Sequence, residues 1–198
     1  MFAYIKGSLE EKTSNYVVID VSGIGYKIFM SANSINIIGE LGNIVKVHTH
    51  YYVREDNISL YGFLSNEELK MFELLLSVSG IGAKSAISML SNITPSDFAL
   101  AIITNNVAAL TKIPGIGAKS AQRIILELKD KLKDAENVSK TEESNKKVNS
   151  ENMKDALDAL QILGYNKKEI EKVLEKLELE DMSTENIIKN ALKYLSRN

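Results

Sequence analysis

The sequence predicts a multidomain α+β protein with an N-terminal barrel of short strands, a central helical domain, and a C-terminal three-helix bundle on a flexible linker. Three observations predict this organisation. Apolar residues alternate with a period of two in residues 1–63 and recur at three- and four-residue spacing in residues 64–133, and a polar stretch, 134–150, precedes a last helical segment, 151–198. We expect these four ranges to be the domains and the linker.

The barrel is predicted by about five segments that have the alternation of half-buried strands. Gly, Asn and Ser separate them, as expected of turns. Five short strands of this kind favour a small closed barrel, with the OB fold as the leading candidate. The segments are FAYIKGSLEE (2–11), YVVIDV (16–21), GYKIFM (25–30), NIVKVHTHYYV (43–53) and ISLYGF (58–63).

The period changes to that of amphipathic helices from Asn66 onward. In the central domain this pattern covers 66–78, 95–103, 107–113 and 118–132, with short connections. Residues 134–150 combine charges of both signs with Ser, Thr and Asn, which is typical of a flexible linker. The three helices predicted after it, 152–166, 167–179 and 183–197, can bury only a thin core, which favours a docking module over a catalytic one.

Composition excludes several kinds of site. The chain has no cysteine, which excludes disulfides, thiolate metal sites and a cysteine nucleophile. His48 and His50 share a strand face without a nearby carboxylate, so we expect no metal site and no cofactor.

The chain shows neither a membrane-length apolar run nor a signal-peptide pattern, so we expect a cytoplasmic protein without a membrane partner. Net charge is −2, but residues 63–133 hold eight basic and six acidic side chains and form the only positive segment.

That positive segment contains GIGAKSA twice, at residues 80–86 and 115–121. The glycines permit a tight turn, and the helix that follows presents unpaired amides suited to a phosphate. Lysine and serine one or two positions into each helix can bind the same phosphate, so the pattern looks like paired helix-hairpin-helix motifs that grip the DNA backbone. The candidate DNA-binding residues are Gly80, Gly82, Lys84, Ser85, Gly115, Gly117, Lys119, Ser120 and Arg123.

The glycines are also compatible with other kinds of turn. A P-loop needs Gly directly before Lys, where Ala83 and Ala118 stand, and the dinucleotide fingerprint needs a preceding strand, so both fail. A single Gly-x-Gly can simply close a helical hairpin, and the same tripeptide at 23–25 precedes a strand pattern and predicts a strand turn.

Arg123 also has two interpretations. It can contact a phosphate, or it can be an ordinary solvated charge on the helix surface.

The order of these parts resembles the RuvA family of Holliday junction branch-migration subunits over essentially the whole chain. The most specific elements are THYYVREDNISLYGF (49–63), then VSGIGAKSA and IPGIGAKSAQR at the expected distances. Ala118 stands where a second lysine is possible, so we expect weaker contacts there than in relatives that carry one. The resemblance implies a non-catalytic protein of homologous recombination and DNA repair that assembles as a homotetramer or an octamer. The resemblance further implies that it binds a four-way DNA junction and recruits the hexameric RuvB ATPase, with the RuvC resolvase in the same complex.

The resemblance also implies residue roles. Glu55 and Asp56 match an acidic pin that keeps the crossover open, although Glu-Asp between two strands is also typical of a solvated turn. In the tail, the resemblance implies that four residues contact RuvB. The alternative is that they pack in the core of the bundle itself. They are Leu160, Leu163, Tyr165 and Leu192.

Two other function classes fit the sequence less well than a non-catalytic DNA-binding protein. A DNA glycosylase or metal nuclease also uses helix-hairpin-helix grips, but it needs a catalytic carboxylate in a pocket or several convergent carboxylates, and Glu55-Asp56 is the only acidic pair between barrel strands. A single-strand-binding OB protein needs exposed aromatic side chains on the barrel. Tyr51, Tyr52 and Tyr61 are available for that role or for the core.

Overall fold

The computed structural model of the chain forms two compact units. It describes residues 2–55, 57–138, 151–177, 179 and 182–195, of which 131–138 and 151 are described by their backbone alone. The first unit comprises Met1–Glu73 with Gly82–Asn92, and the second comprises Leu74–Ile81 with Ile93–Asn198. The division therefore falls within the first GIGAKSA, between Ile81 and Gly82.

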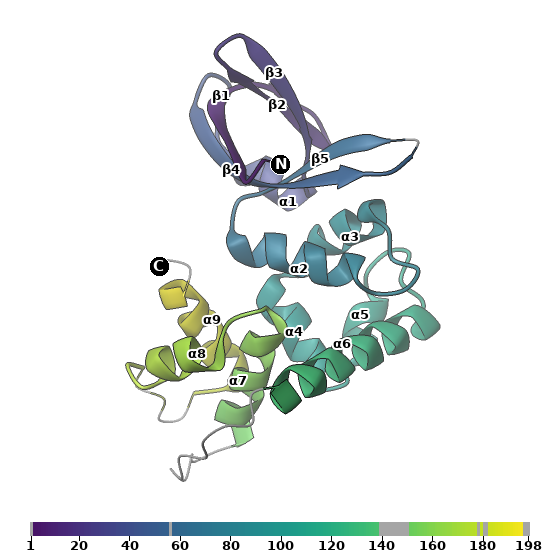
Figure 1. Cartoon of the computed structure of the whole chain (residues 1–198), viewed down its shortest axis with the longest axis vertical. Helices are drawn as coiled ribbons and strands as arrows, with labels where there is room; N and C mark the ends of the chain where they lie inside the picture. The colour runs from purple at the N-terminus through teal and green to yellow at the C-terminus, as the bar shows by residue number, and fades with distance from the viewer. Residues whose placement is uncertain (1, 56, 139–150, 178, 180–181, 196–198) are drawn as a thin grey trace. The chain divides into compact units, whose positions relative to one another are not determined.

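The first unit contains a closed five-stranded barrel with the strand order β1-β2-β3-β5-β4 (Figure 1). All neighbouring strands are antiparallel except β3 and β5, which pair in parallel. The strands are β1 Tyr4–Lys12, β2 Tyr16–Val21, β3 Ile24–Phe29, β4 Ile44–Val53 and β5 Ile58–Phe63. The predicted small closed barrel is confirmed, and each of the five alternating segments corresponds to one strand.

Barrel closure depends on β1, which pairs with β4 along its first half and with β2 along its second. Gly7 lies where the strand turns from one partner to the other. A Cβ atom at this position would lie 2.0 Å from the Asp20 carbonyl oxygen, which no side chain tolerates. A bulge between Leu9 and Glu11 adds local twist, as bulges do in small barrels.

The barrel core follows from the alternation, because every second residue of each strand points inward. The buried side chains include Ile5, Leu9, Val17, Ile19, Ile28, Val45, Val47 and Leu60.

The sequence pattern did not predict one short helix that the structure contains. Helix α1, Ala32–Ile37, lies between β3 and β4 and is only six residues long, so it shows no helical period. Its start is a local hydrogen bond, in which the Ser31 side chain accepts from the Ser34 amide.

Helices α2 (Asn66–Leu76) and α3 (Ala83–Leu90) follow the barrel. The start of α2 is capped in two directions: the Glu68 amide donates to the Ser65 hydroxyl, and the Leu64 amide donates to the Glu68 carboxylate. On its inner face the Phe72 ring packs against Phe63, with a centroid distance of 4.9 Å. These contacts fix α2 against the end of the barrel in the first unit.

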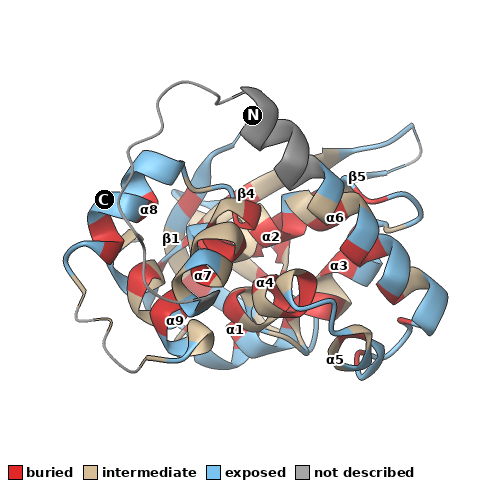
Figure 2. Cartoon of the chain, turned by 90° about the horizontal axis from the view of Figure 1, so that it is seen from below, coloured by how far each residue is buried: buried red, intermediate tan, exposed pale blue. Residues whose placement is uncertain are grey.

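The second unit is helical, and buried and exposed residues alternate along its helices (Figure 2). Its helices are α4 Pro95–Ile103, α5 Val107–Thr111, α6 Ala118–Val138, α7 Glu151–Ile162, α8 Lys167–Leu174 and α9 Thr184–Leu195. Buried residues of α7, α8 and α9 form one cluster, to which α4 contributes Ala99. The three helices predicted for the C-terminal bundle are therefore present, and with the barrel and the central helices they confirm the predicted fold class in its three folded parts.

The end of α6 differs from the predicted boundary. The helix continues to Val138, five residues into the range predicted as linker, which starts at 134. The segment 134–138 contains neither Gly nor Pro, so nothing in it stops a helix once α6 has formed. The remaining residues of the predicted linker, 139–150, lie outside the described residues.

Candidate nucleic-acid interface

The two GIGAKSA segments fold into loops with matching backbone geometry. In each, the amide of the isoleucine between the two glycines closes a turn onto the carbonyl three positions before it, at 3.1 Å: Ile81 onto Val78 and Ile116 onto Ile113. The first glycine of each loop is left-handed, with φ +80° at Gly80 and +84° at Gly115. Only glycine adopts this conformation at little cost, which explains why the repeat requires it.

The second glycine of each loop precedes a helix and has no side chain with which to cap it. Gly82 is the N-cap of α3, with φ −97° and ψ 171°, and no side chain caps the helix there. Gly117 holds the same place before α6, where the Ala121 amide donates to its carbonyl at 2.9 Å. A Cβ atom at either glycine would meet nothing within 4 Å. Each loop thus presents helix-start amides on an open surface, which suits an approaching phosphate.

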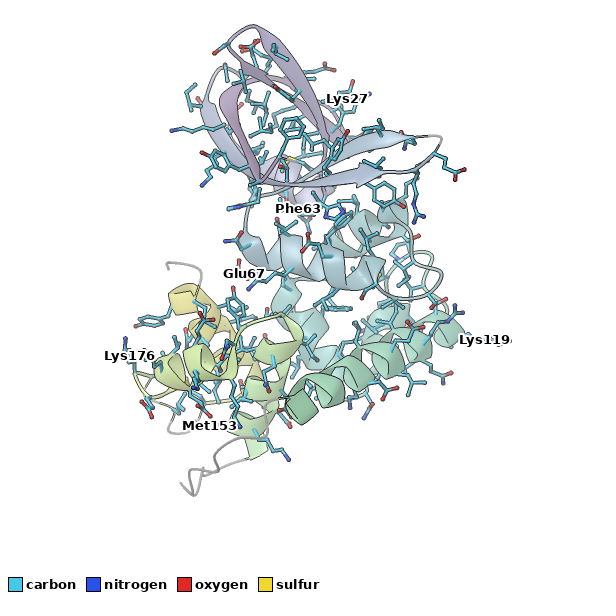
Figure 3. All side chains as sticks on the ribbon, in the orientation of Figure 1. Lys27, Phe63, Glu67, Lys119, Met153 and Lys176 are labelled. Atoms are coloured by element: carbon cyan, nitrogen blue, oxygen red, sulfur yellow. The ribbon has the colours of Figure 1, made fainter. Side chains whose placement is uncertain are left out.

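Side chains in both repeats are divided between core and solvent in the same way. Ala86 and Ala121 are fully buried, whereas Lys84 and Lys119 are exposed. Lys119 extends from the first turn of α6 into solvent (Figure 3). Each exposed lysine is two residues from the glycine that precedes its helix, so its ammonium group can reach an anion bound at the helix start.

The second half of the repeat differs slightly between the two copies. Ser85 is exposed and Ser120 is half-buried, and Ala83 is buried while Ala118 is exposed. Ser85 can therefore donate its hydroxyl to a phosphate more freely than Ser120. The exposed methyl group of Ala118 offers no hydrogen bond.

Arg123 has a role that sequence reasoning did not identify. Its Nη1 atom donates to the carbonyl oxygen of Ser79, in the loop before α3, at 3.1 Å. The amide of the same serine donates to Oε2 of Glu127, one turn further along α6, at 3.1 Å. Helix α6 therefore holds Ser79 from both sides. Arg123 remains exposed and has further N–H donors for a second acceptor.

Glu55 lies at the tip of the β4–β5 hairpin, which projects from the barrel (Figure 1). The hairpin is closed by the Arg54 amide, which donates to the Asn57 carbonyl at 2.8 Å. Glu55 is exposed, and Asp56, the second residue assigned to the acidic pin, lies outside the described residues. The side chain of Arg54 is turned back along the hairpin, where its Nε donates to the Tyr52 hydroxyl at 2.8 Å.

The barrel tyrosines are not equivalent. Tyr61 is only 6 % exposed and packs on Phe72, so its ring is part of the core. This burial raises the pKa of the Tyr61 hydroxyl above its ordinary value. Tyr51 is 37 % exposed and Tyr52 is half-buried. A single-strand-binding surface built from all three rings, one of the alternatives considered from the sequence, is therefore incompatible with the position of Tyr61.

The two histidines of β4 have different surroundings. His50 Nδ1 lies 3.0 Å from the carboxylate of Glu73, which belongs to the part of α2 in the first unit. Desolvation, together with the nearby Lys46, holds the pKa of His48 below its ordinary value. No group of three or more His, Asp and Glu side chains is placed to hold a metal ion within the part of the chain that is described.

The four tail residues assigned to partner contacts fall into two groups. Leu160 and Leu163 are fully buried in the cluster of the second unit, as the competing core interpretation expects. Tyr165 and Leu192 are half-buried and therefore keep some surface. Tyr194 was not singled out from the sequence, although it is 49 % exposed on α9. The sequence gives little indication of a contact role for Tyr194, because a single exposed aromatic residue on an amphipathic helix has no distinctive spacing.

No single helix among the described residues is both long and apolar enough to cross a membrane, and α3 with α4 meets that test only as a bent pair.

The fold and the loops together define a class: a barrel protein with tandem helix-hairpin-helix motifs and a C-terminal helical bundle. Three family models match the chain. They are described as RuvA N terminal domain (residues 1–62), SAM-like Helix-hairpin-helix tandem (72–130) and RuvA, C-terminal domain (151–196).

Full-length relatives agree with these matches. The chain is 53 % identical over 201 residues to the Holliday junction branch migration complex subunit RuvA of Acetivibrio thermocellus, covering 100 % of both proteins. It is 46 % identical over 199 residues to the protein of the same name from Ruminiclostridium cellulolyticum, covering 98 % of this chain and 100 % of the relative. The Clostridium perfringens strain SM101 protein of that name is also 46 % identical, over 202 residues and 100 % of both. The chain belongs to the RuvA family.

Proposed function

We propose that this chain is the non-catalytic DNA-binding subunit of a branch-migration complex. It binds four-way DNA junctions by their structure, keeps the crossover open, and recruits and stimulates the RuvB ATPase. The observation that carries the proposal is the duplicated loop, in which helix-start amides, an open glycine and an exposed lysine recur together. The names of the full-length relatives, subunits of a Holliday junction branch migration complex, support the same function.

The loops suit the phosphate backbone better than base edges. Main-chain amides and an ammonium group recognise phosphate oxygens, which carry no sequence information. Each phosphate neutralised by a lysine releases counterions, so the affinity falls as salt rises, with a slope of about −0.9 per phosphate in a plot of log K against log salt. Binding of this kind is independent of sequence. A protein that acts wherever a crossover has migrated needs that property.

Several copies are needed to bind the arms of one junction. We propose self-association as a homotetramer, with an octamer as the alternative assembly. Exposed apolar side chains on the first 63 residues support a protein–protein interface there. They are Phe2, Tyr4, Ile24, Ile37, Leu41, Ile44, Tyr51, Val53 and Ile58.

The acidic hairpin fits a role at the crossover. Carboxylates at the tip of a projecting hairpin repel nearby phosphates, which opposes tight seating of the strands and favours an open junction. The exposure of Glu55 supports this proposal, and we assign the same role to its neighbour Asp56.

We assign the C-terminal bundle to RuvB, with RuvC as a further member of the complex. Tyr165 and Leu192 keep surface for a direct contact. Leu160 and Leu163 are buried, so in this proposal they support the contact surface from within the bundle. The ATPase activity belongs to the partner.

The test is a gel-shift competition between a synthetic four-way junction and a linear duplex of the same sequence, at moderate salt. We expect a strong preference for the junction. The variants Lys84→Gln and Lys119→Gln should each weaken junction binding, because each removes a cation from one loop. Lys168→Gln is the matched control, since Lys168 is also an exposed lysine but belongs to α8, away from both loops in the sequence.

Equal affinity for junction and duplex would refute structure-selective binding. Unchanged affinity in both loop variants would refute the phosphate grip. Recruitment is tested separately, by adding RuvB and measuring its ATPase rate with and without this chain on junction DNA. No stimulation by the wild-type chain would refute the assignment of the tail.

A further inference from the structure

The first unit contains a groove of about 660 Å³, and the roles assigned so far touch it at Lys84 and at Ile58, one of the exposed apolar side chains proposed for self-association. Its walls come from three places: Lys27 and Phe29 on β3, Ile58 and Tyr61 on β5, and Lys84 and Ile87 on α3. Lys84 is the lysine of the first GIGAKSA, so the groove begins at one of the two proposed phosphate grips. Lys27 lies on the outside of the barrel, on the side of the β4–β5 hairpin (Figure 3).

The groove exists because the barrel closes weakly at this seam. β3 and β5 are paired only through Phe29 and Tyr61, whereas β4 and β5 are paired along six positions from His48–Phe63 to Val53–Ile58. β5 therefore follows β4 into the projecting hairpin and leaves β3 beyond this single pair. The opening lies between β3 and the hairpin, and α3 lines its other side.

The charge of the groove has one sign. Among the described residues, its lining includes two lysines, no acidic residue, and the polar side chains of two asparagines and two serines. Cations with neutral hydrogen-bonding groups suit an anionic backbone. The apolar side chains of Phe29 and Ile58 in the lining can pack against sugars.

The ammonium group of Lys27 lies over two aromatic rings. Its Nζ lies 4.0 Å from the centroid of the Tyr16 ring and 5.5 Å from that of Phe29. A cation over two ring faces is stabilised by both, and its N–H groups on the other side stay available. The nearby acidic group, Glu11, accepts a hydrogen bond from the Tyr16 hydroxyl at 2.9 Å, which raises the pKa of Tyr16. The ring is therefore neutral at ordinary pH.

We infer that this groove holds the sugar–phosphate backbone of one DNA strand, with Lys27 as a second cation beyond Lys84. The strand leaves the first helix-hairpin-helix loop and continues along the barrel toward the hairpin that bears Glu55. The inference rests on the proposed function, because it extends the path of the same DNA. It adds a DNA-binding residue on the barrel, outside both repeats.

The test measures junction affinity of the full chain from 50 to 200 mM salt for Lys84→Gln and for three new variants. Lys27→Gln should reduce the slope by about 0.9 for each phosphate that Lys27 neutralises, so over this range its affinity falls about 3.5-fold less than that of the wild type for each such phosphate. Lys27→Arg keeps the charge and should restore the slope. Lys46→Gln is the matched control, because Lys46 also lies over a ring, with Nζ 4.5 Å from the Tyr4 centroid, but does not line the groove.

The outcomes separate this inference from the proposed function. If Lys84→Gln weakens binding while Lys27→Gln and Lys46→Gln behave like wild type, the groove does not hold DNA and the grip proposal stands. If Lys27→Gln alters the assembly size in sedimentation and leaves the salt slope unchanged, a second copy of the chain covers the groove and the inference is overturned. If the wild type shows no preference for the junction, the proposed function itself fails.

Discussion

Gly80→Ala and Gly115→Ala should lower the free energy of unfolding by different amounts, although each places the same methyl group in a matching turn of the repeat. Gly80 and Gly115 both have a left-handed φ. An L-residue in this conformation costs about 1–2 kcal/mol, so Gly115→Ala, whose Cβ meets nothing within 4 Å, should cost that amount alone. At Gly80 the Cβ would lie 3.1 Å from Nη1 of Arg123, which must then move.

That movement adds to the cost of Gly80→Ala. The same Nη1 donates to the Ser79 carbonyl, and a hydrogen bond from a charged donor contributes about 1.5–3 kcal/mol. Because Arg123 is exposed, we expect a partial loss of about 1 kcal/mol, which brings Gly80→Ala to about 2–3 kcal/mol. The assay is urea unfolding followed by circular dichroism, with free energies taken from midpoint and slope.

The Arg123→Ala background provides the control. Without the guanidinium group, Gly80→Ala and Gly115→Ala should cost the same, as in a double-mutant cycle. An equal or greater cost for Gly115→Ala in the wild-type background would refute the reasoning. So would a difference that persists without Arg123.

Three further predictions concern the pin, the barrel and the bundle. Glu55→Gln combined with Asp56→Asn should leave junction binding intact or tighter while changing the rate of branch migration; a loss of folding in circular dichroism would show that the pair is structural instead. Because the pKa of folded His48 is below its ordinary 6.5, the unfolded chain binds the proton more readily, so His48 costs stability only as pH falls through 6.5 toward the lower folded value. His48→Gln should flatten the part of the pH profile that lies below the ordinary pKa of 6.5, and an unaltered profile would contradict the assignment. Leu163→Ala should cost about 2–5 kcal/mol, because a fully buried leucine leaves a cavity; a cost below about 1 kcal/mol by thermal unfolding would show that the bundle does not rely on it.

The features predicted correctly from the sequence are those governed by short-range patterns. Alternation identified all five barrel strands, because the period of two is visible wherever one face is buried. The helix missed between β3 and β4 has a single buried isoleucine, Ile35, in six residues, which is too little for a period. The end of α6 was placed early because a charged, polar composition describes both a linker and the exposed end of a helix.

The candidate site shows the same limit. The residue types of the repeat indicated a turn with a left-handed glycine and an exposed lysine in each copy, since a few neighbouring residues determine both. The contacts of Arg123 and Glu127 with Ser79 join residues 44 and 48 positions apart, and no local pattern predicts them. Leu160 and Leu163 illustrate the converse difficulty, because an apolar residue on a small bundle shows the same pattern whether it packs inward or meets a partner.

The hold of α6 on Ser79 has a consequence for how the repeat opens. The carbonyl and the amide of Ser79 are both bonded to side chains of α6, so unwinding of that helix also frees the loop. When the first half of α6 unwinds, the loop before α3 is released together with the loop before α6. Deuterium should therefore enter at Val78 and Ile81 at least as fast as at Ile124 and Leu128, so the loop before α3 is never better protected than the first half of α6.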